Sequence, residues 1–232
     1  MHRVEVAASI LTADFGNLYR VVRKLERSGI DRIHLDVMDG HFVNNITFGP
    51  DVVSAVRRLT SLPIDAHLMI AEPDRYTDRF LDAGADSITF HVEVEASDDD
   101  KRTTLRRIAD ARRGAGLAVS PDTPVAAVEP FVDDLAIVLI MTVYPGWGGQ
   151  RFLADRAPKI AEARRLLGRR KGTSVHVDGG VSGDTAETVG SYGIDVCVVG
   201  SALFQRGHDT AREVERVRGV AEAAARTALQ PA

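Results

Sequence analysis

The sequence lacks several features that would point to particular classes of protein. Its 232 residues include a single cysteine, Cys197, so no intrachain disulfide can form, which agrees with a reducing compartment. The N-terminal stretch has no basic segment leading into a long apolar run, so we expect no secretory signal and a cytoplasmic location. The longest apolar run, residues 136–144, is too short to cross a bilayer as a helix, and no membrane role is predicted.

Basic clusters are also missing. The formal net charge is −4 and no long basic run stands out, whereas affinity for a nucleic-acid backbone requires clustered Lys and Arg. The hydrophobic share of 44% and the charged share of 27% are ordinary for a soluble globular protein. The sequence therefore predicts no nucleic-acid partner.

What the sequence does contain is a repeated alternation of two kinds of segment. Short β-rich runs are separated by segments with the apolar spacing of helices, and several of these end in glycine, as helices commonly do. Neither a linker nor a low-complexity stretch interrupts the alternation. The candidate strands are residues 4–11, 32–38, 64–70, 87–93, 117–120, 137–143, 174–178 and 195–200, and the candidate helices include 17–29, 50–60, 73–84, 157–168 and about 209–225.

Eight strand-then-helix units predict an α/β protein with the (β/α)8 TIM-barrel fold. We expect one catalytic domain over residues 1–225, followed by a frayed tail over residues 226–232. An open, doubly wound sheet of the Rossmann kind is the competing architecture. It is disfavoured because the first turn after a candidate strand has no G-x-G-x-x-G motif.

Polar residues gather on one face of several candidate strands, because side chains alternate in direction along a strand. Such a face would meet water in an antiparallel sheet with one wet side, but that sheet needs hairpins, and the connections here have the length of helices. In a parallel barrel these faces point inward, where unpaired ionisable groups are costly. They therefore need each other or a metal; the inward groups are Ser9, His34 with Asp36, Asp65 with His67, His91 with Glu93, and His176 with Asp178.

Four of these residues form a candidate metal site: His34, Asp36, His67 and Asp178. All four lie in the later halves of their strands, and barrel enzymes place their chemistry at the C-terminal strand ends. One buried histidine is more often a hydrogen-bonded structural residue than a ligand, but four such residues from three strands reverse that expectation. Two imidazoles and two carboxylates suit Zn²⁺, Fe²⁺, Mn²⁺ or Co²⁺ without deciding among them.

Methionines and glycines lie near the same strand ends. Met38, Met69 and Met141 could each be ordinary packing residues, but together they would surround one cavity mouth. In TIM barrels the loops after the last strands commonly hold a phosphate through backbone N–H groups, so we predict a phosphorylated small molecule as ligand. The glycine-containing segments are YPGWGGQ at 144–150, Gly179-Gly180 and Gly200-Ser201.

Longer motifs extend through the chain around these positions. They are SILTADFGNL at 9–18, IHLDVMDGHFVNNITFGP at 33–50, HLMI at 67–70, AGADSITFHVE at 83–93, MTVYPGWGGQRF at 141–152, VDGGV at 177–181 and VGSALF at 199–204. The combination H-x-D-x-M-D-G-H-F, H-L-M and V-D-G-G is highly specific. It resembles the ribulose-phosphate 3-epimerase family, nearly from end to end of the chain.

The resemblance implies a barrel of the ribulose-phosphate binding type and a metal-dependent isomerase of carbohydrate metabolism in the pentose phosphate pathway. Such an enzyme inverts carbon 3 and interconverts D-ribulose 5-phosphate and D-xylulose 5-phosphate through an enediolate. One divalent metal ion and no organic cofactor are implied, and we expect a homo-oligomer, a dimer or a hexamer. By motif position, Asp36 and Asp178 resemble the acid/base pair and, with His34 and His67, the metal ligands.

The resemblance also implies which residues meet the substrate. A glycine-rich lid and two glycine-containing loops would bind the sugar phosphate, and the methionines would pack against the enediolate. The implied substrate contacts are Ser9, His67, Gly146, Trp147, Gly148, Gly149, Asp178, Gly179, Gly180, Gly200 and Ser201, and the packing residues are Met38, Met69 and Met141.

Departures from the family pattern bear on the substrate. Pro, Asn, Asn and Phe are usual in the family where this chain has Asn44, Ser120, Tyr144 and Trp147. Because Tyr144 and Trp147 fall in the predicted lid, a D-allulose 6-phosphate 3-epimerase or another ketose-phosphate epimerase is the alternative. That relative tends to have alanine in the glycine loop, so Gly148-Gly149 favours the pentose enzyme.

Two more distant functional classes are disfavoured by particular residues. Decarboxylases of the same superfamily depend on a lysine in an Asp-x-Lys-x-x-Asp motif, whereas this chain has Met38 at the lysine position, which disfavours decarboxylation. A catalytically inactive sugar-phosphate-binding protein would use the same phosphate loops, but it has no need of the pair Asp36 and Asp178.

Overall fold

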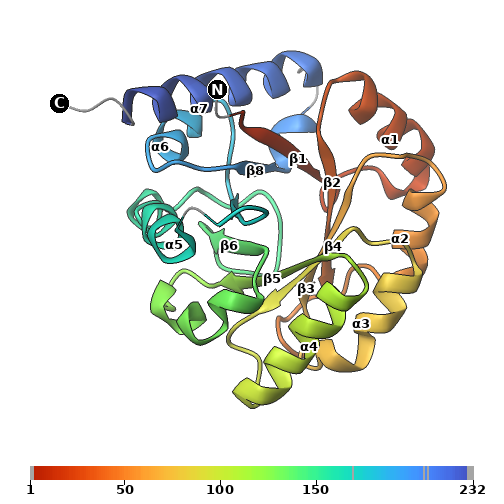
Figure 1. The fold of residues 1–232 in the computed structure, drawn as a ribbon. Helices are drawn as coiled ribbons and strands as arrows, with labels where there is room; N and C mark the ends of the chain where they lie inside the picture. The colour runs from red at the N-terminus through yellow and green to blue at the C-terminus, as the bar shows by residue number, and fades with distance from the viewer. Residues whose placement is uncertain (1–2, 169, 206, 208, 229–232) are drawn as a thin grey trace.

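Eight parallel strands close into a barrel that a ring of helices surrounds (Figure 1). The computed structural model describes residues 3–168, 170–205, 207 and 209–228. The strands pair in chain order, and β8 returns to β1 so that Val196 pairs with Glu5. The (β/α)8 TIM-barrel prediction is confirmed and the open doubly wound sheet is wrong. The strands are β1 (Glu5–Ser9), β2 (Arg32–Met38), β3 (Ile64–Met69), β4 (Ser87–His91), β5 (Gly114–Val119), β6 (Ile137–Met141), β7 (Ser174–Asp178) and β8 (Val196–Val199).

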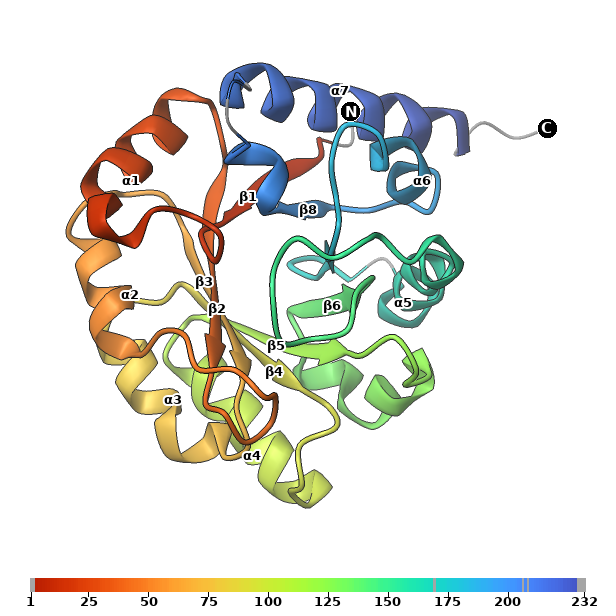
Figure 2. The ribbon, with the colours of Figure 1, turned by 180° about the vertical axis from the view of Figure 1, so that it is seen from behind.

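The helices begin where local sequence favours a helix start. Pro50 and Pro73 open α2 and α3, where a missing N–H costs nothing, and the Ser97 hydroxyl caps α4 by accepting from the Asp100 N–H. Figure 2 shows the same ring from behind. The helices are α1 (Leu18–Arg27), α2 (Pro50–Arg57), α3 (Pro73–Asp82), α4 (Asp98–Asp110), α5 (Lys159–Leu167), α6 (Ala186–Gly190) and α7 (Thr210–Ala228), with 3-10 turns η1 (Phe15–Asn17), η2 (Val125–Asp134), η3 (Ala154–Arg156) and η4 (Ser201–Leu203).

Several details of the elements differ from the sequence prediction. Helix α7 continues to Ala228, so residues 226–228 of the expected frayed tail are helical, and residues 229–232 lie outside the described residues. Strand β5 begins at Gly114 rather than at residue 117. The additional residues include Gly116, which packs so closely against β6 that a Cβ there would lie 3.0 Å from the Ile137 Cβ. Between β5 and β6 the chain forms 3-10 turns containing Pro130, whose missing N–H disfavours an α-helix.

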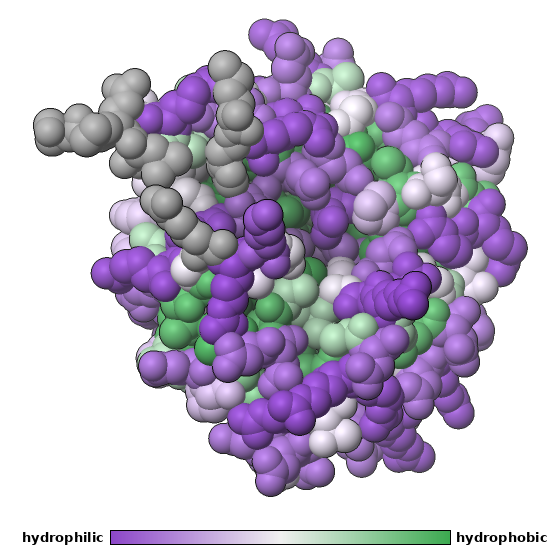
Figure 3. Space-filling view, in the orientation of Figure 1, coloured by the Kyte–Doolittle hydropathy of each residue, from purple (hydrophilic) through white to green (hydrophobic). Residues whose placement is uncertain are grey.

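Apolar side chains fill two layers of the barrel. The outward strand faces pack with the helices in one large core, in which Leu35 and Cys197 of the sheet join Leu25 of α1. A smaller cluster inside the barrel includes Leu139 and Val198. Toward the C-terminal strand ends, buried polar side chains from β2 and β3 lie among these apolar residues, and this is where the candidate site lies. On the face seen in Figure 3, hydrophilic side chains predominate and apolar residues show between them.

None of the helices within the described ranges has both the length and the apolar character that a bilayer-spanning segment requires.

Candidate active site

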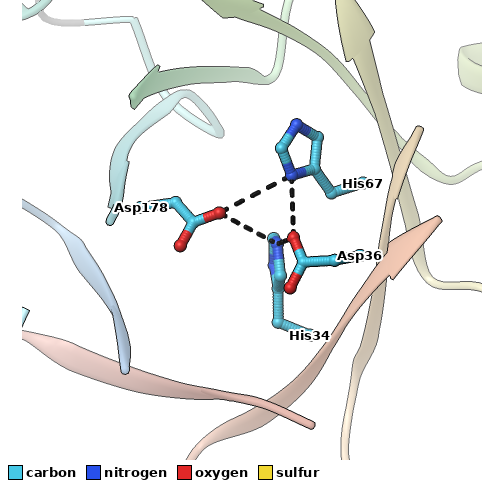
Figure 4. Close-up of side chains that lie close together, drawn as sticks. All are labelled: His34, Asp36, His67 and Asp178. Atoms are coloured by element: carbon cyan, nitrogen blue, oxygen red, sulfur yellow. Dashed lines mark hydrogen bonds and ion pairs between the residues drawn. The ribbon is translucent and has the colours of Figure 1, made fainter. Parts of the chain in front are cut away.

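Three strands bring four ionisable side chains together inside the barrel (Figure 4). His34 and Asp36 come from β2, His67 from β3 and Asp178 from the last position of β7. One ligand atom from each lies within 4.8 Å of the others, and all but Asp178 are buried. The structure therefore gathers the four predicted metal ligands at one point.

Ring nitrogens and carboxylate oxygens face each other in this cluster. His67 Nδ1 lies 3.1 Å from Asp36 Oδ1 and 3.6 Å from Asp178 Oδ2. His34 Nε2 lies 3.4 Å and 3.8 Å from the same two oxygens. Ser9 Oγ donates to the other oxygen of Asp36 at 2.6 Å, which fixes the orientation of that carboxylate.

The donor set fits a divalent metal ion. Both ring nitrogens of His34 are buried without a hydrogen-bond partner, which is costly for a residue that serves only the core. An ion among the four side chains would use the lone pair of His34 Nε2. Two imidazoles and two carboxylates suit Zn²⁺, Fe²⁺, Mn²⁺ or Co²⁺, so the cluster could bind a metal whose identity stays open.

Electrostatics favours positive charge at the centre of the cluster. Burial lowers the pKa of His34, but attraction to the Asp36 carboxylate outweighs it and raises that pKa to about 9. Burial raises the pKa of Asp36, but His34 and His67 outweigh it and hold that pKa well below its usual range. The protein therefore presents the ionised carboxylate of Asp36 where a cation would sit.

Two other inward groups do not join the cluster. Asp65 lies lower in the barrel, where it accepts a hydrogen bond from Arg32 at 2.9 Å. His176 pairs with the Ser174 hydroxyl at 2.9 Å, and burial lowers its pKa to about 3, so it is neutral. Strand parity points both residues inward, but their hydrogen bonds join them to Arg32 and Ser174 rather than to the metal cluster.

A cavity opens above the cluster and contains nearly all the other predicted contact residues. The three methionines line it, together with residues of the loops after β6, β7 and β8. Its lining includes Ser9, Asp36, Met38, Met69, Met141, Gly146, Trp147, Gly148, Gly149, Asp178, Gly179, Gly180, Gly200 and Ser201. His34 and His67 are buried beneath this lining.

Comparison with known proteins gives the family. The sequence pattern of the ribulose-phosphate 3 epimerase family matches residues 5–204. This chain belongs to that family. It is 44% identical to the ribulose-phosphate 3-epimerase of Bacillus subtilis over 93% of this chain and 99% of that protein. Against the ribulose-phosphate 3-epimerase of Rhodobacter capsulatus it is 40% identical over 95% and 97% of the two chains.

Solved structures of low sequence similarity share the fold. A 3-keto-L-gulonate-6-phosphate decarboxylase from Vibrio cholerae matches with a TM-score of 0.73 at 12% identity, over 95% of this chain and 98% of that one. A 3-hexulose-6-phosphate synthase matches with a TM-score of 0.70 at 17% identity, over 94% and 99% of the two chains. At such identities the likeness shows the barrel alone.

The loop between β6 and η3, where the sequence predicted a lid, lies at the rim of the cavity. Asn45, from the loop after β2, donates to the Gly146 carbonyl at 2.7 Å. Gln150 donates to the carbonyls of Tyr144 and Trp147 at 2.6 and 2.9 Å. Both aromatic side chains stay about half exposed at the cavity rim, at 47% and 58%. The parts of this loop are therefore joined by hydrogen bonds to each other and to the loop after β2.

Sequence reasoning missed the residues that support the cluster from behind. His67 Nε2 lies 2.9 Å from His91 Nε2, and His91 Nδ1 lies 3.0 Å from Glu93 Oε2. The Ser120 N–H donates to the other oxygen of Glu93 at 2.8 Å. The available sequence signal was strand parity, which predicts that His91 and Glu93 point into the barrel. Their contact with His67 required the register of β3 against β4, which the sequence does not show.

Proposed function

We propose that this protein interconverts D-ribulose 5-phosphate and D-xylulose 5-phosphate by metal-dependent inversion at carbon 3. The observation that carries the proposal is the pair Asp36 and Asp178, which approach one cluster from different sides of the barrel (Figure 4). Inversion through a planar enediolate needs one proton-transferring group on each face of the substrate. A buried carboxylate from β2 and one from β7 meet that need.

Each remaining group has a role that follows from its position. The Ser9 hydroxyl orients Asp36 by donating to one oxygen, so that the other oxygen of this carboxylate faces the cluster. His34, Asp36, His67 and Asp178 would hold the metal ion. When bound, a divalent ion supplies Lewis-acid stabilisation of the negative charge that develops on the ketone and hydroxyl oxygens. No organic cofactor is needed.

The cavity wall and rim would bind the rest of the substrate. Met38, Met69 and Met141 exclude water beside the two carboxylates and offer polarizable sulfur to a planar, electron-rich intermediate. Backbone N–H groups at Gly179-Gly180 and Gly200-Ser201 would receive the phosphate, as loops after the last barrel strands commonly do. The segment from Gly146 to Gly149, with Trp147, would cover the bound sugar.

Replacing one of the two carboxylates tests the mechanism. In Asp178→Asn we expect loss of interconversion by roughly 10²-fold or more, because one face has no proton-transferring group. Asp36 remains, so exchange of the carbon 3 proton with D₂O should persist for one of the two epimers and vanish for the other. Both rates are followed by proton NMR at saturating metal, with metal content measured.

The matched control is Asp184→Asn, an exposed carboxylate in the loop after β7 whose side chain is 78% accessible. It should leave both rates near those of the unchanged protein. Wild-type rates of interconversion in Asp178→Asn, or exchange of both epimers, would contradict the two-base mechanism.

Comparing two ketose phosphates tests the substrate. We expect a higher kcat/KM with D-ribulose 5-phosphate than with D-allulose 6-phosphate, because Gly148-Gly149 follows the pattern of the pentose enzyme. The opposite order would favour a hexose phosphate epimerase, and binding without turnover would favour an inactive sugar-phosphate-binding protein. The same preparation, examined by light scattering, tests the expected homo-oligomer. A cytoplasmic location remains our expectation.

A further inference from the structure

The two ring nitrogens of His67 have different surroundings. Nδ1 faces the metal cluster, 3.1 Å from Asp36 Oδ1 and 3.6 Å from Asp178 Oδ2. Nε2 faces away from the cluster and meets His91 Nε2 at 2.9 Å. Both rings are fully buried, so no water competes for these nitrogens. Two nitrogens at this distance require one proton between them, and its position decides which tautomer each ring adopts.

The ionised carboxylate of Glu93 determines which of the two rings carries that proton. Burial raises the pKa of Glu93, but hydrogen bonds from His91 and from the Ser120 N–H outweigh it and bring that pKa to about 2. Glu93 is therefore a carboxylate, which accepts and cannot donate. His91 must then carry its proton on Nδ1, 3.0 Å from Glu93 Oε2, and present a lone pair on Nε2.

The lone pair of His91 in turn selects the tautomer of His67. Nε2 of His67 has to carry the proton that His91 accepts, so the nitrogen left to bind a metal ion is Nδ1, which faces the cluster. The Phe42 ring packs on His91 with centroids 4.8 Å apart and restricts its rotation. Ser120 Oγ lies 3.2 Å from His91 Nδ1 on the Glu93 side and reinforces the same orientation.

We propose that Glu93 and His91 are positioning residues, which hold His67 in the tautomer and orientation that leave Nδ1 free to bind the metal. The inference rests on the proposed metal ligands and adds two residues behind them. A carboxylate behind a ligating imidazole fixes the ring and raises its basicity, and loss of such a partner typically weakens metal binding 10- to 100-fold.

Metal affinity of the protein, rather than turnover, tests this proposal. We would measure the dissociation constant for Zn²⁺ by competition with a chromophoric chelator, and the absorption spectrum of the Co²⁺ form. In Glu93→Gln we expect roughly 10-fold or greater weakening, because an amide can donate to His91 Nδ1 and so reverse the tautomers. The control is Glu95→Gln, an exposed residue two positions along the chain, which should bind as the unchanged protein does.

Two substitutions at His91 separate positioning from packing. In His91→Gln a side-chain oxygen can still accept from His67 Nε2, so affinity should exceed that of His91→Leu, which offers no acceptor. The melting temperatures of the metal-free variants show whether each one folds. ¹⁵N NMR of the Zn²⁺ form should show the proton of His91 on Nδ1.

The outcomes are distinguishable from failure of the proposed function. Folded Glu93→Gln and His91→Leu with wild-type affinity would overturn the positioning role while leaving the four ligands intact, as would a His91 proton on Nε2. If the unchanged protein bound no divalent ion tightly, the ligand set would fall and the positioning role with it.

Discussion

His34, His67 and His176 are all buried and all point into the barrel, yet their chemistry differs. His176 has a hydroxyl partner and a pKa lowered by burial to about 3, whereas carboxylates raise the pKa of His34 to about 9. His67 bridges the cluster and His91. Side-chain direction alone therefore does not make a ligand; the groups that surround the side chain do.

Gly180 shows how one residue constrains the rim of the cavity. Its φ is +66°, a left-handed conformation that costs other residues about 1–2 kcal/mol, and a Cβ would lie 2.6 Å from the Phe152 backbone nitrogen. Strain and overpacking together should make Gly180→Ala destabilising by about 3 kcal/mol. Urea denaturation of the purified variant measures this change in the free energy of unfolding.

Gly193 provides the matched control for Gly180. Its φ is +80°, but a Cβ there would have nothing within 4 Å. Gly193→Ala should therefore cost only about 1 kcal/mol, the conformational part alone. Equal losses in the two variants would show that the contact with Phe152 does not limit this position.

At the scale of elements, the loops after β2 and β6 act together over the cavity. The bond from Asn45 to the Gly146 carbonyl spans 101 residues of sequence and fixes the lid against the opposite rim. Trp147 is the only tryptophan of the chain, so its fluorescence reports on this loop alone. We expect the emission to change when a sugar phosphate binds beneath the lid.

Asn45→Ala should weaken that binding. One lost hydrogen bond corresponds to about 1 kcal/mol, or roughly a several-fold rise in the dissociation constant. Titration of Trp147 fluorescence with D-ribulose 5-phosphate measures it, and Asn44→Ala, at the exposed neighbouring position, is the control. Equal dissociation constants for the two variants would show that the Asn45 hydrogen bond does not strengthen sugar phosphate binding.

At the scale of the whole molecule, closure of the barrel leaves no free edge among its eight strands. Strand β8 lies between β1 and β7, and its Cys197 points outward into the core between sheet and helices, with no exposed surface. Burial raises the pKa of the Cys197 thiol to about 12. Exposing this thiol to a reagent therefore requires a large opening of the barrel.

Cys197 should react with a thiol reagent only as the protein unfolds. We expect no modification in native buffer over hours and one thiol per chain in concentrated urea, because the reactive thiolate is absent from the buried site. At intermediate urea the labelled fraction should follow the loss of circular dichroism. Rapid labelling of the native protein would show that Cys197 is accessible without unfolding, and would contradict its burial in the closed barrel.

The sequence alone determined the fold and most of the cluster, for physical reasons. Eight alternations of apolar runs and helical spacing leave few architectures, and strand parity already separates His34 and Asp36 from Leu35. The sequence did not predict where β5 begins, because Gly114 and Gly116 are poor strand formers. The barrel holds them in β5 by close packing.

Tertiary structure alone decided which inward residues meet. Parity could not tell that Asp65 pairs with Arg32 while Asp36 joins the metal cluster, because both partners come from neighbouring strands. Nor could it place His91 behind His67, or Asn45 against Gly146. These contacts join strands and loops that only the closed barrel brings side by side, so sequence supplied the chemical groups and the fold supplied their partners.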